Sequence, residues 1–475
     1  MKKKKTRKKQ GKFGRVLAIV LAVLLTVGAC GLVYTLVNRH TYTAEAEVYK
    51  ELGKFAYWSD KTGDKVSEEN PYTYRAKAEK ELTAVYEDFI NVKVVEKASD
   101  ATASFDKSTL TYKTTNWFNL AYLTEPLTHG MAVNVELSGT QIIFGVSELN
   151  RIENSEKYGW GLNYAKLFVP QANVYASGGD DSTPASLIQS TTANMGTKSK
   201  VLSDANFADS AKHTATIIVH DKLIVYVDGK QIVNDDKSWD LDKTKEYYLT
   251  LAGDCTYTFT DIRNVEEFVG KKITYLGDSI TAGVGSDYTN ATVQRYSHVL
   301  ATELGATEYN MGISGTVLCT GNASRASRIS DVDKIPEDSD YVIVMLGTND
   351  FDQASKGFAE LGEEGSEDTT TVHGAADALC KKLQEKFKKT DVKVYIVTPI
   401  PRQNDVKNES KCANDYTLRD FSEVLIHYAE KYDLNYFDLN AESGITAADM
   451  ANNLHPNTLG TAKMVTALKG ALLAK

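Results

Sequence analysis

ITYLGDSIT, residues 273–281, begins as an apolar run and ends as a short polar motif. The run is typical of a buried strand, and the motif would lie at the carboxyl end of that strand. The same pattern recurs beyond residue 270, where predicted strands (341–346, 392–398 and 434–439) alternate with predicted helices (293–304, 375–387, 418–431 and 459–473). This alternation predicts an α/β fold with a parallel sheet, whose ligand site is expected at the carboxyl ends of the strands.

Polar motifs follow the predicted strands at that edge. They are Gly277–Thr281, Asn310–Gly315 and Gly347–Asp350, and Leu454–Asn457 lies close to the C-terminus. Taken alone, the first motif could be a helix cap, because Asp and Ser are good capping residues. The four motifs together favour one catalytic site over chance.

With these motifs, roughly residues 271–475 resemble the SGNH (GDSL-like) hydrolase superfamily, which implies a flavodoxin-like catalytic domain over residues 269–475. The resemblance makes Ser279 the nucleophile and His455 the base that takes its proton. It also implies an oxyanion hole formed by the backbone N–H groups of Ser279 and Gly315 and the side-chain amide of Asn349. Asp278 and Asp350 would neighbour this site.

The chain departs from the family pattern three residues before His455, where most members have an aspartate and this sequence has Asn452. In a serine-protease triad, the comparable change from aspartate to asparagine lowers turnover by about four orders of magnitude. Asn452 could accept the histidine hydrogen bond in a Ser-His dyad, or Asp449 could reach the ring instead. The third alternative is an inactive protein that only binds its ligand.

Residues 98–268 have short alternating runs separated by turn residues, which predicts an antiparallel, jelly-roll-like β-sandwich. The clearest part is Thr214–Val233, in which Asp228-Gly229 suits a tight hairpin turn. The segment resembles concanavalin-like and laminin G-like modules. Its aromatic side chains could stack on a sugar or pack in the core; they are Trp117, Tyr158, Trp160 and Tyr164.

The N-terminal residues predict a membrane anchor. A basic tail, residues 1–15, precedes 22 uncharged residues, 16–37, which could span a bilayer core of about 30 Å. The positive flank places the tail in the cytoplasm and the rest of the chain outside the cell. Cleavage at Cys30 or after Ala44–Ala46 is the alternative. Residues 38–97 are interpreted as a stalk with helical segments.

Charge and cysteine usage narrow the function classes. Residues 1–40 carry ten basic and no acidic side chains, so the net charge of −9 leaves −19 on residues 41–475. The negative charge of the part predicted to lie outside the cell argues against nucleic acid as a partner. The cysteines Cys255, Cys319, Cys380 and Cys412 show no repeated spacing. They predict neither a disulfide framework nor a zinc site, and no metal or cofactor is expected.

These features predict a membrane-anchored, extracytoplasmic esterase that removes small acyl groups, above all acetyl, from a carbohydrate. The predicted sandwich and the likeness to polysaccharide acetylesterases favour that substrate. A lysophospholipase or lipase is the second alternative, although the acidic segment 359–368 disfavours a lipid surface. An inert glycan-binding surface protein is the third.

Overall fold

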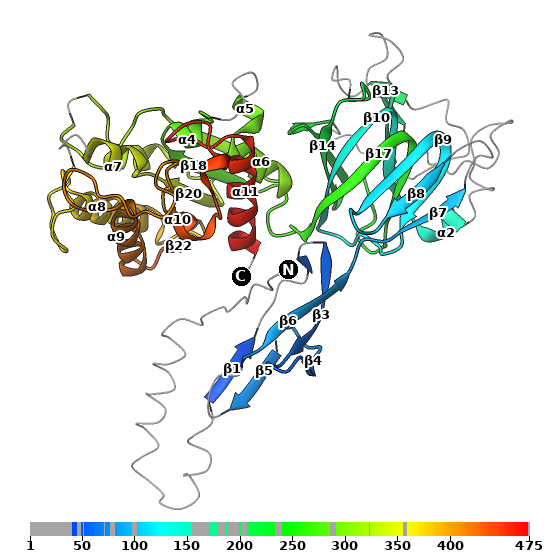
Figure 1. Cartoon of the computed structure of the whole chain (residues 1–475), viewed down its shortest axis with the longest axis horizontal. Coiled ribbons are helices and arrows are strands. Elements are labelled where there is room, and N and C mark those ends of the chain that lie inside the picture. Colours follow the sequence, from blue (N-terminus) through cyan, green and yellow to red (C-terminus); the bar gives the residue numbers. More distant parts are fainter. Residues whose placement is uncertain are drawn as a thin grey trace, which may run out of the picture.

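The computed structural model shows three β-sheet regions and a set of helices gathered around one of the sheets (Figure 1). It describes residues 40–44, 49–50, 52–70, 72–76, 81–96, 102–153, 172–177, 186–188, 199–201, 207–232, 240–285, 291–322, 324–354 and 359–473. The predicted basic tail and membrane span, residues 1–15 and 16–37, lie outside these ranges. No helix among the described residues is long and apolar enough to cross a membrane.

The C-terminal sheet has five parallel strands in the order β19-β18-β20-β21-β22, which confirms the predicted α/β fold. The inner strands consist largely of buried residues, as expected for a sheet covered on both faces. Their bounds are β18 (Lys272–Gly277), β19 (Thr307–Gly312), β20 (Tyr341–Met345), β21 (Lys393–Val397) and β22 (Asn435–Phe437).

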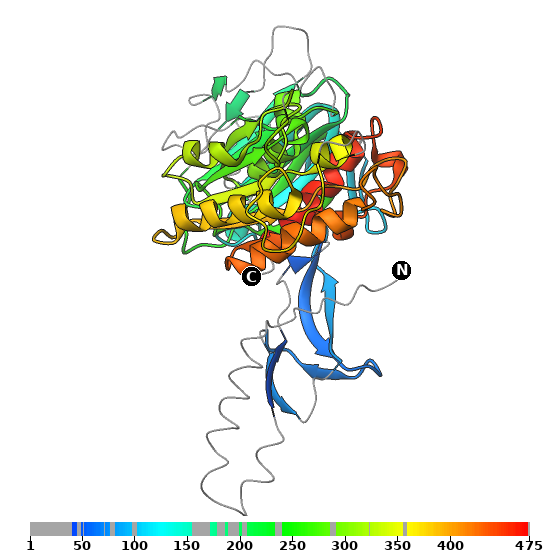
Figure 2. The same cartoon turned by 90° about the vertical axis from the view of Figure 1, so that its left-hand side faces the viewer.

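Helices cover both faces of this sheet, as Figures 1 and 2 show. Alternate residues of β20 enter two separate cores: Val342 and Val344 pack with α8 and α9, whereas Ile343 and Met345 pack with α6 and α11. The predicted helix 293–304 is divided into two. The helices are α4 (Ser279–Ala282), α5 (Ala291–Gln294), α6 (Tyr296–Glu303), α7 (Thr348–Ala354), α8 (Val372–Phe387), α9 (Leu418–Lys431), α10 (Leu439–Glu442) and α11 (Thr458–Leu473), with 3-10 turns η3 (Ile329–Lys334) and η4 (Ala447–Asp449).

The second region is an antiparallel sheet of eleven strands built on two long ones, which confirms the antiparallel prediction. Strands β10 (Met131–Ser147) and β17 (Tyr248–Asn264) pair along their whole lengths. The predicted hairpins are present as β14 to β16, and Asp228 and Gly229 have the positive φ angles that their turn requires. The other strands are β7 (Val92–Glu96), β8 (Ala103–Asp106), β9 (Thr111–Leu123), β11 (Ala172–Ser177), β12 (Ser186–Ile188), β13 (Ser199–Val201), β14 (His213–Val219), β15 (Leu223–Val227) and β16 (Lys230–Gln231), besides helix α2 (Leu149–Glu153).

The likeness of this region to concanavalin modules remains a prediction. Residues 158, 160 and 164 of the predicted sugar platform lie outside the described residues, and the side chain of Trp117 is likewise not described.

The predicted helical stalk is wrong in the described part of residues 38–97, which forms strands. These build a narrow arm that extends from the larger units (Figures 1 and 2). Tyr72–Ala76 pairs with His40–Ala44, and Trp58 is buried in a second small sheet, so pairing between separate segments stabilises strands here. Residues 77–80, in the middle of the strongest predicted helical run, lie outside the described residues. The strands are β1 (His40–Ala44), β2 (Tyr49–Lys50), β3 (Gly53–Ser59), β4 (Lys65–Ser67), β5 (Tyr72–Ala76) and β6 (Thr83–Asp88), and β7 already joins the large sheet.

The antiparallel sheet packs directly on the C-terminal domain. The side chains of Ala132 and Ile218, on the antiparallel sheet, pack in the hydrophobic core of the C-terminal domain. That core also contains Phe268, Leu300 and Leu304. Lys469 on α11 is buried and forms an ion pair with Asp261 on β17 at 2.5 Å. This shared core and the polar contacts join the two units. Linker residues 265–271 run between them.

Candidate active site

The sharp turn after β18 presents Ser279 at the start of α4. The Asp278 side chain caps this helix by accepting a hydrogen bond from the backbone N–H of Ile280 at 2.9 Å. Gly312 on β19 allows the turn to approach, because a Cβ there would lie 2.3 Å from the backbone nitrogen of Ala282. Sequence therefore places Ser279 at the carboxyl end of a parallel strand, as the motif predicts.

His455 lies against this serine although 176 residues separate them in sequence. The Nε2 atom of His455 is 2.9 Å from the Ser279 hydroxyl oxygen. Burial lowers the pKa of the imidazole, which favours the neutral ring at neutral pH. A neutral Nε2 can accept the hydroxyl proton, so this pair has the geometry of a nucleophile and its general base.

The other ring nitrogen of His455 faces Asn452. The Nδ1 atom is 3.2 Å from the Asn452 side-chain oxygen, which also accepts the backbone N–H groups of Leu454 and His455. An amide oxygen can only accept, so this contact requires a proton on Nδ1 and leaves the lone pair on Nε2. Asn452 thus selects the tautomer that a base requires.

Asp449 does not contact the histidine. Its carboxylate accepts hydrogen bonds from the backbone and hydroxyl of Thr446 at 2.7 Å and from Lys463 at 2.6 Å. These hydrogen bonds, that of Lys463 first, lower its pKa to about 2 despite partial desolvation. This geometry favours Asn452 over Asp449 as the residue that orients His455, because the Asp449 carboxylate is already bound by Thr446 and Lys463.

Two neighbouring loops carry the expected oxyanion donors. Gly315 has a φ of +79°, and a Cβ there would meet only the Arg325 guanidinium at 3.6 Å, so its side of the loop is open to an approaching group. Asn349 is buried, and its amide nitrogen donates to the Thr316 carbonyl at 2.9 Å. That amide carries a second N–H, which the Thr316 contact does not use.

Arg325 joins these two loops and is a residue that sequence reasoning missed. Its Nη1 atom donates to the Gly315 carbonyl at 3.2 Å and to the Asn349 side-chain oxygen at 3.3 Å. With its oxygen held by a guanidinium, Asn349 keeps its amide N–H groups on the other side. No motif marks Arg325 in the sequence.

A second arginine holds the strand ends beneath the site. The buried Arg328 donates to the carbonyls of Gly277 on β18 and Met311 on β19, both at 2.7 Å, and pairs with Asp331 at 2.5 Å. One rigid guanidinium therefore fixes the end of the nucleophile strand against the neighbouring strand.

The two aspartates expected near the site are both buried and act on the backbone. Asp350 accepts the backbone N–H groups of Leu318 and Cys319 at 2.8 and 2.7 Å, and burial raises its pKa. Burial also raises the pKa of Asp278 to about 7. Neither carboxylate has a recorded contact with His455 among the described residues.

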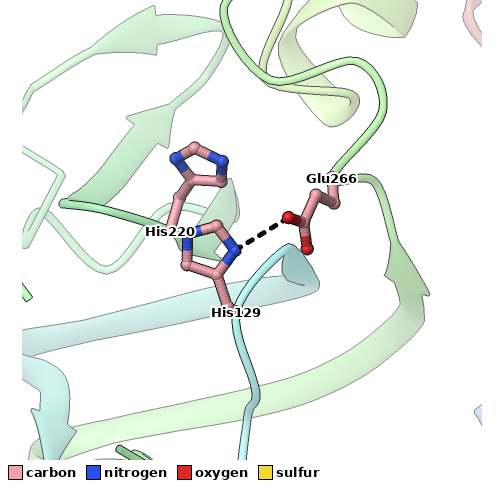
Figure 3. Close-up of side chains that lie close together, drawn as sticks. All are labelled: His129, His220 and Glu266. Carbon is pink, nitrogen blue, oxygen red and sulfur yellow. Dashed lines mark ion pairs between the residues drawn. The ribbon is translucent and has the colours of Figure 1, made fainter. Parts of the chain in front are cut away.

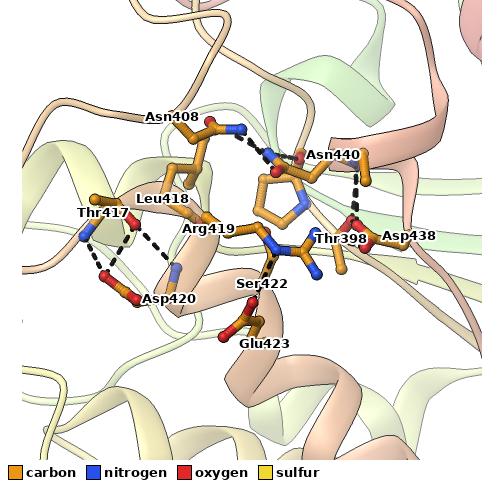
Figure 4. A network of polar contacts seen from close by, with 12 residues as sticks. Thr398, Asn408, Thr417, Leu418, Arg419, Asp420, Ser422, Glu423, Asp438 and Asn440 are labelled. Atoms are coloured by element: carbon orange, nitrogen blue, oxygen red, sulfur yellow. Dashed lines mark hydrogen bonds and ion pairs between the residues drawn. The ribbon is translucent and has the colours of Figure 1, made fainter.

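The loop that carries His455 also contacts the segment after β21. The backbone N–H groups of Gln403 and Asn404 donate to the carbonyl and side-chain oxygens of Asn453, both at 3.2 Å. Figure 4 shows the network that holds the segment after β21: Asn408 bonds Asn440 at 2.8 Å, and Asp438 accepts from Thr398 at 3.0 Å. The segment that contacts Asn453 is thus itself held by polar contacts with residues 438–440.

The comparisons with known proteins agree with this geometry. Residues 275–463 match the GDSL-like Lipase/Acylhydrolase family and therefore form a GDSL-like lipase/acylhydrolase domain of the SGNH type. No curated protein matches the chain significantly. The chain is a carboxylic ester hydrolase.

Several solved structures resemble this domain. A protein from Lactobacillus plantarum is 25% identical, with 43% of this chain aligned to 97% of that one and a TM-score of 0.37. A putative arylesterase from Agrobacterium tumefaciens is 21% identical, with coverages of 42% and 98% and a TM-score of 0.33. A carbohydrate acetylesterase family member from Sinorhizobium meliloti is 18% identical, with coverages of 42% and 97% and a TM-score of 0.32.

Proposed function

We propose that this protein is a membrane-anchored, extracytoplasmic serine esterase that removes small acyl groups, above all acetyl, from carbohydrate. The observation that carries the chemistry is the 2.9 Å contact between the Ser279 hydroxyl and His455 Nε2. The acidic exterior and the adjoining antiparallel domain support a neutral or carbohydrate substrate over a nucleic acid.

The reaction begins when the Ser279 oxygen attacks the ester carbonyl carbon and His455 Nε2 takes the hydroxyl proton. The carbonyl oxygen becomes negatively charged. The backbone N–H groups of Ser279 and Gly315 and the Asn349 amide stabilise this oxyanion. The imidazolium then gives its proton to the leaving sugar hydroxyl as the carbon–oxygen bond breaks.

An acyl-enzyme on Ser279 results, and water completes the cycle. His455, again neutral, takes a proton from the attacking water, and the second tetrahedral intermediate releases the carboxylic acid as the proton returns to the serine oxygen. Asn452 holds the ring throughout by accepting a hydrogen bond from Nδ1–H. Because Asn452 is uncharged, it stabilises the imidazolium less than a carboxylate would.

A small acyl group suits the fixed acidic segment 359–368. Its backbone is tied to the start of α8, where Val372 donates to Glu360 at 2.9 Å and His373 to Leu361 at 3.0 Å, and Gly365 donates to the Tyr428 hydroxyl. A segment that is negatively charged and held by these hydrogen bonds is poorly suited to bind a lipid surface.

Acyl-group release by the full chain in detergent tests this proposal. We expect acetate release from acetylated polysaccharides and from p-nitrophenyl acetate, and none with Ser279→Ala. Fatty-acid release from lysophospholipid without any acetate release would replace the carbohydrate esterase with a lipase.

The proposed location has a separate test in intact cells. If residues 16–37 anchor the chain with its C-terminus outside, added protease removes a C-terminal tag without cell lysis. A tag that resists protease until the cells are lysed would overturn the location and leave the esterase chemistry unaffected.

A further inference from the structure

Two imidazoles and a carboxylate gather where the antiparallel sheet meets the linker to the catalytic domain. His129 precedes β10, His220 follows β14, and Glu266 follows β17 (Figure 3). Nitrogen and oxygen atoms from these three side chains lie within 4.8 Å of one another. The two imidazole rings lie close together, with centroids 4.1 Å apart and planes tilted by 36°.

His129 lies between two carboxylates. Its Nδ1 atom is 3.1 Å from a Glu266 oxygen, and its Nε2 atom is 3.0 Å from Asp221. Histidines that bind a metal through one nitrogen commonly donate from the other to a carboxylate, which fixes the ring and raises its basicity. Asp221 is placed for that supporting role, because it contacts Nε2 whereas Glu266, a member of the cluster, contacts Nδ1.

His220 supplies a second imidazole. Within the part of the chain that the structure describes, its ring nitrogens have no recorded hydrogen-bond partner. Together with His129 and Glu266, it gives the cluster two imidazole rings and one carboxylate.

The backbone is built for close approach at this point. A Cβ on residue 130 would lie 2.4 Å from the Glu266 Cβ, so the glycine allows the His129 loop to reach the linker. Gly130 also donates to Val219 and accepts from Val265, both at 2.7 Å. Three segments that are distant in sequence are thus held together beneath the side chains.

We propose that His129, His220 and Glu266 bind one divalent transition-metal ion of the zinc type, with Asp221 orienting His129 and water completing the coordination. Two imidazole nitrogens and one carboxylate oxygen suit Zn²⁺, whereas Ca²⁺ and Mg²⁺ prefer oxygen ligands. Tetrahedral bonds of about 2.0–2.1 Å separate neighbouring ligand atoms by about 3.3 Å, so small side-chain rotations suffice.

The ion would stabilise the connection between the antiparallel sheet and the catalytic domain. Glu266 lies in the linker, and its neighbours hold the catalytic domain: Glu267 accepts from the Tyr341 hydroxyl at 2.7 Å, and Phe268 is buried in the shared core. Binding at Glu266 therefore adds a bond between the antiparallel sheet and the segment that leads into β18. Stability should rise with metal, because the unfolded chain does not hold the three ligands together.

Zinc binding by the full chain tests the site directly. The protein is stripped with EDTA, equilibrated with ZnCl₂, desalted and analysed for metal content and melting temperature. We expect about one tightly held Zn²⁺ per chain and a higher melting temperature with zinc. We expect His129→Ala and His220→Ala to weaken binding at least about 100-fold, and Asp221→Asn to weaken it about 10-fold, as for other supporting carboxylates.

His213→Ala is the matched control. His213 also lies between two carboxylates, Asp209 at 2.9 Å and Asp228 at 2.7 Å, but among the described residues it belongs to no such cluster of ligands. Zinc retention should be unchanged in this variant. Glu266→Gln, at an exposed position, provides a second ligand variant if a histidine variant fails to fold. Failure of the wild type to retain zinc, or equal retention by the double variant of His129 and His220, would overturn the proposal.

Discussion

The side-chain oxygen of Asn452 lies 3.2 Å from Nδ1 of His455, in the position where the family pattern has a carboxylate. The amide preserves the tautomer that lets Nε2 act as a base, and it lacks the negative charge that would stabilise an imidazolium. We therefore propose that the catalytic unit is a Ser-His dyad with a neutral positioning residue.

Changing Asn452 should therefore alter the rate in both directions. Asn452→Asp keeps the acceptor and adds charge, so we expect kcat to rise about 10-fold, which corresponds to about 1.4 kcal/mol. Asn452→Ala loses one neutral hydrogen bond, so kcat should fall about 10-fold. Hydrolysis of p-nitrophenyl acetate measures both effects.

Asp449→Asn separates the two alternatives for the residue that orients the histidine. Because Asp449 binds Thr446 and Lys463, this change should alter kcat much less than Asn452→Ala does. A loss of activity in Asp449→Asn with Asn452→Ala fully active would restore the rejected alternative.

The pH dependence follows from the buried imidazole. His455 must be neutral to act as a base, and burial lowers its pKa, so kcat/KM should rise with pH and reach its plateau around neutrality. The midpoint should lie below the ordinary histidine value of about 6.5. In Asn452→Asp the midpoint should move upward, because a nearby carboxylate favours the charged ring. A wild-type midpoint well above 6.5 contradicts the structure.

Asn349 is the proposed oxyanion donor that acts through its side chain, so its substitution should lower kcat strongly. Removal of one such donor commonly lowers kcat about 10²- to 10³-fold, and we expect Asn349→Ala to fall in that range. Asn349→Asp preserves the shape but cannot donate when ionised, so it should be at least as inactive. Unchanged melting temperatures would show that the loss is catalytic, and wild-type kcat in Asn349→Ala would exclude this donor.

Arg325 should act through the residues that it holds. Arg325→Ala removes the contacts with the Gly315 carbonyl and the Asn349 oxygen, so we expect kcat to fall about 10-fold with little change in KM for a neutral ester. The double variant with Asn349→Ala should lose less than the product of the two single effects, since both act on one donor. Fully multiplicative losses would show that Arg325 acts independently.

The sequence was sufficient for the parallel sheet and for most of the site. Buried parallel strands have continuous apolar runs, and the ends of such strands meet at one edge, so the motifs that contain Ser279, Gly315 and Asn349 were expected to lie near one another. The roles of these residues were implied by the resemblance to the SGNH family. The placement of the motifs needs only local patterns and a known topology.

The remaining features depend on contacts that local patterns do not encode. The choice between Asn452 and Asp449 depends on Lys463, which binds Asp449 and holds it away from the ring. Arg325 acquires its role only when its loop folds back on Asn349. The arm was predicted to contain helices, but Tyr72–Ala76 pairs with a strand formed by residues 40–44, a contact between separate segments. Residues 77–80, within the run 76–82 that favours helix locally, lie outside the described residues.

Covalent labelling of the nucleophile is the most direct test of the Ser279–His455 dyad. The full chain is treated with a fluorophosphonate, and the modified peptide is identified by mass spectrometry. We expect one adduct, on Ser279, that eliminates ester hydrolysis, no labelling of Ser279→Ala, and much slower labelling of His455→Ala. An adduct on another residue, or continued hydrolysis after complete modification of Ser279, would contradict the account.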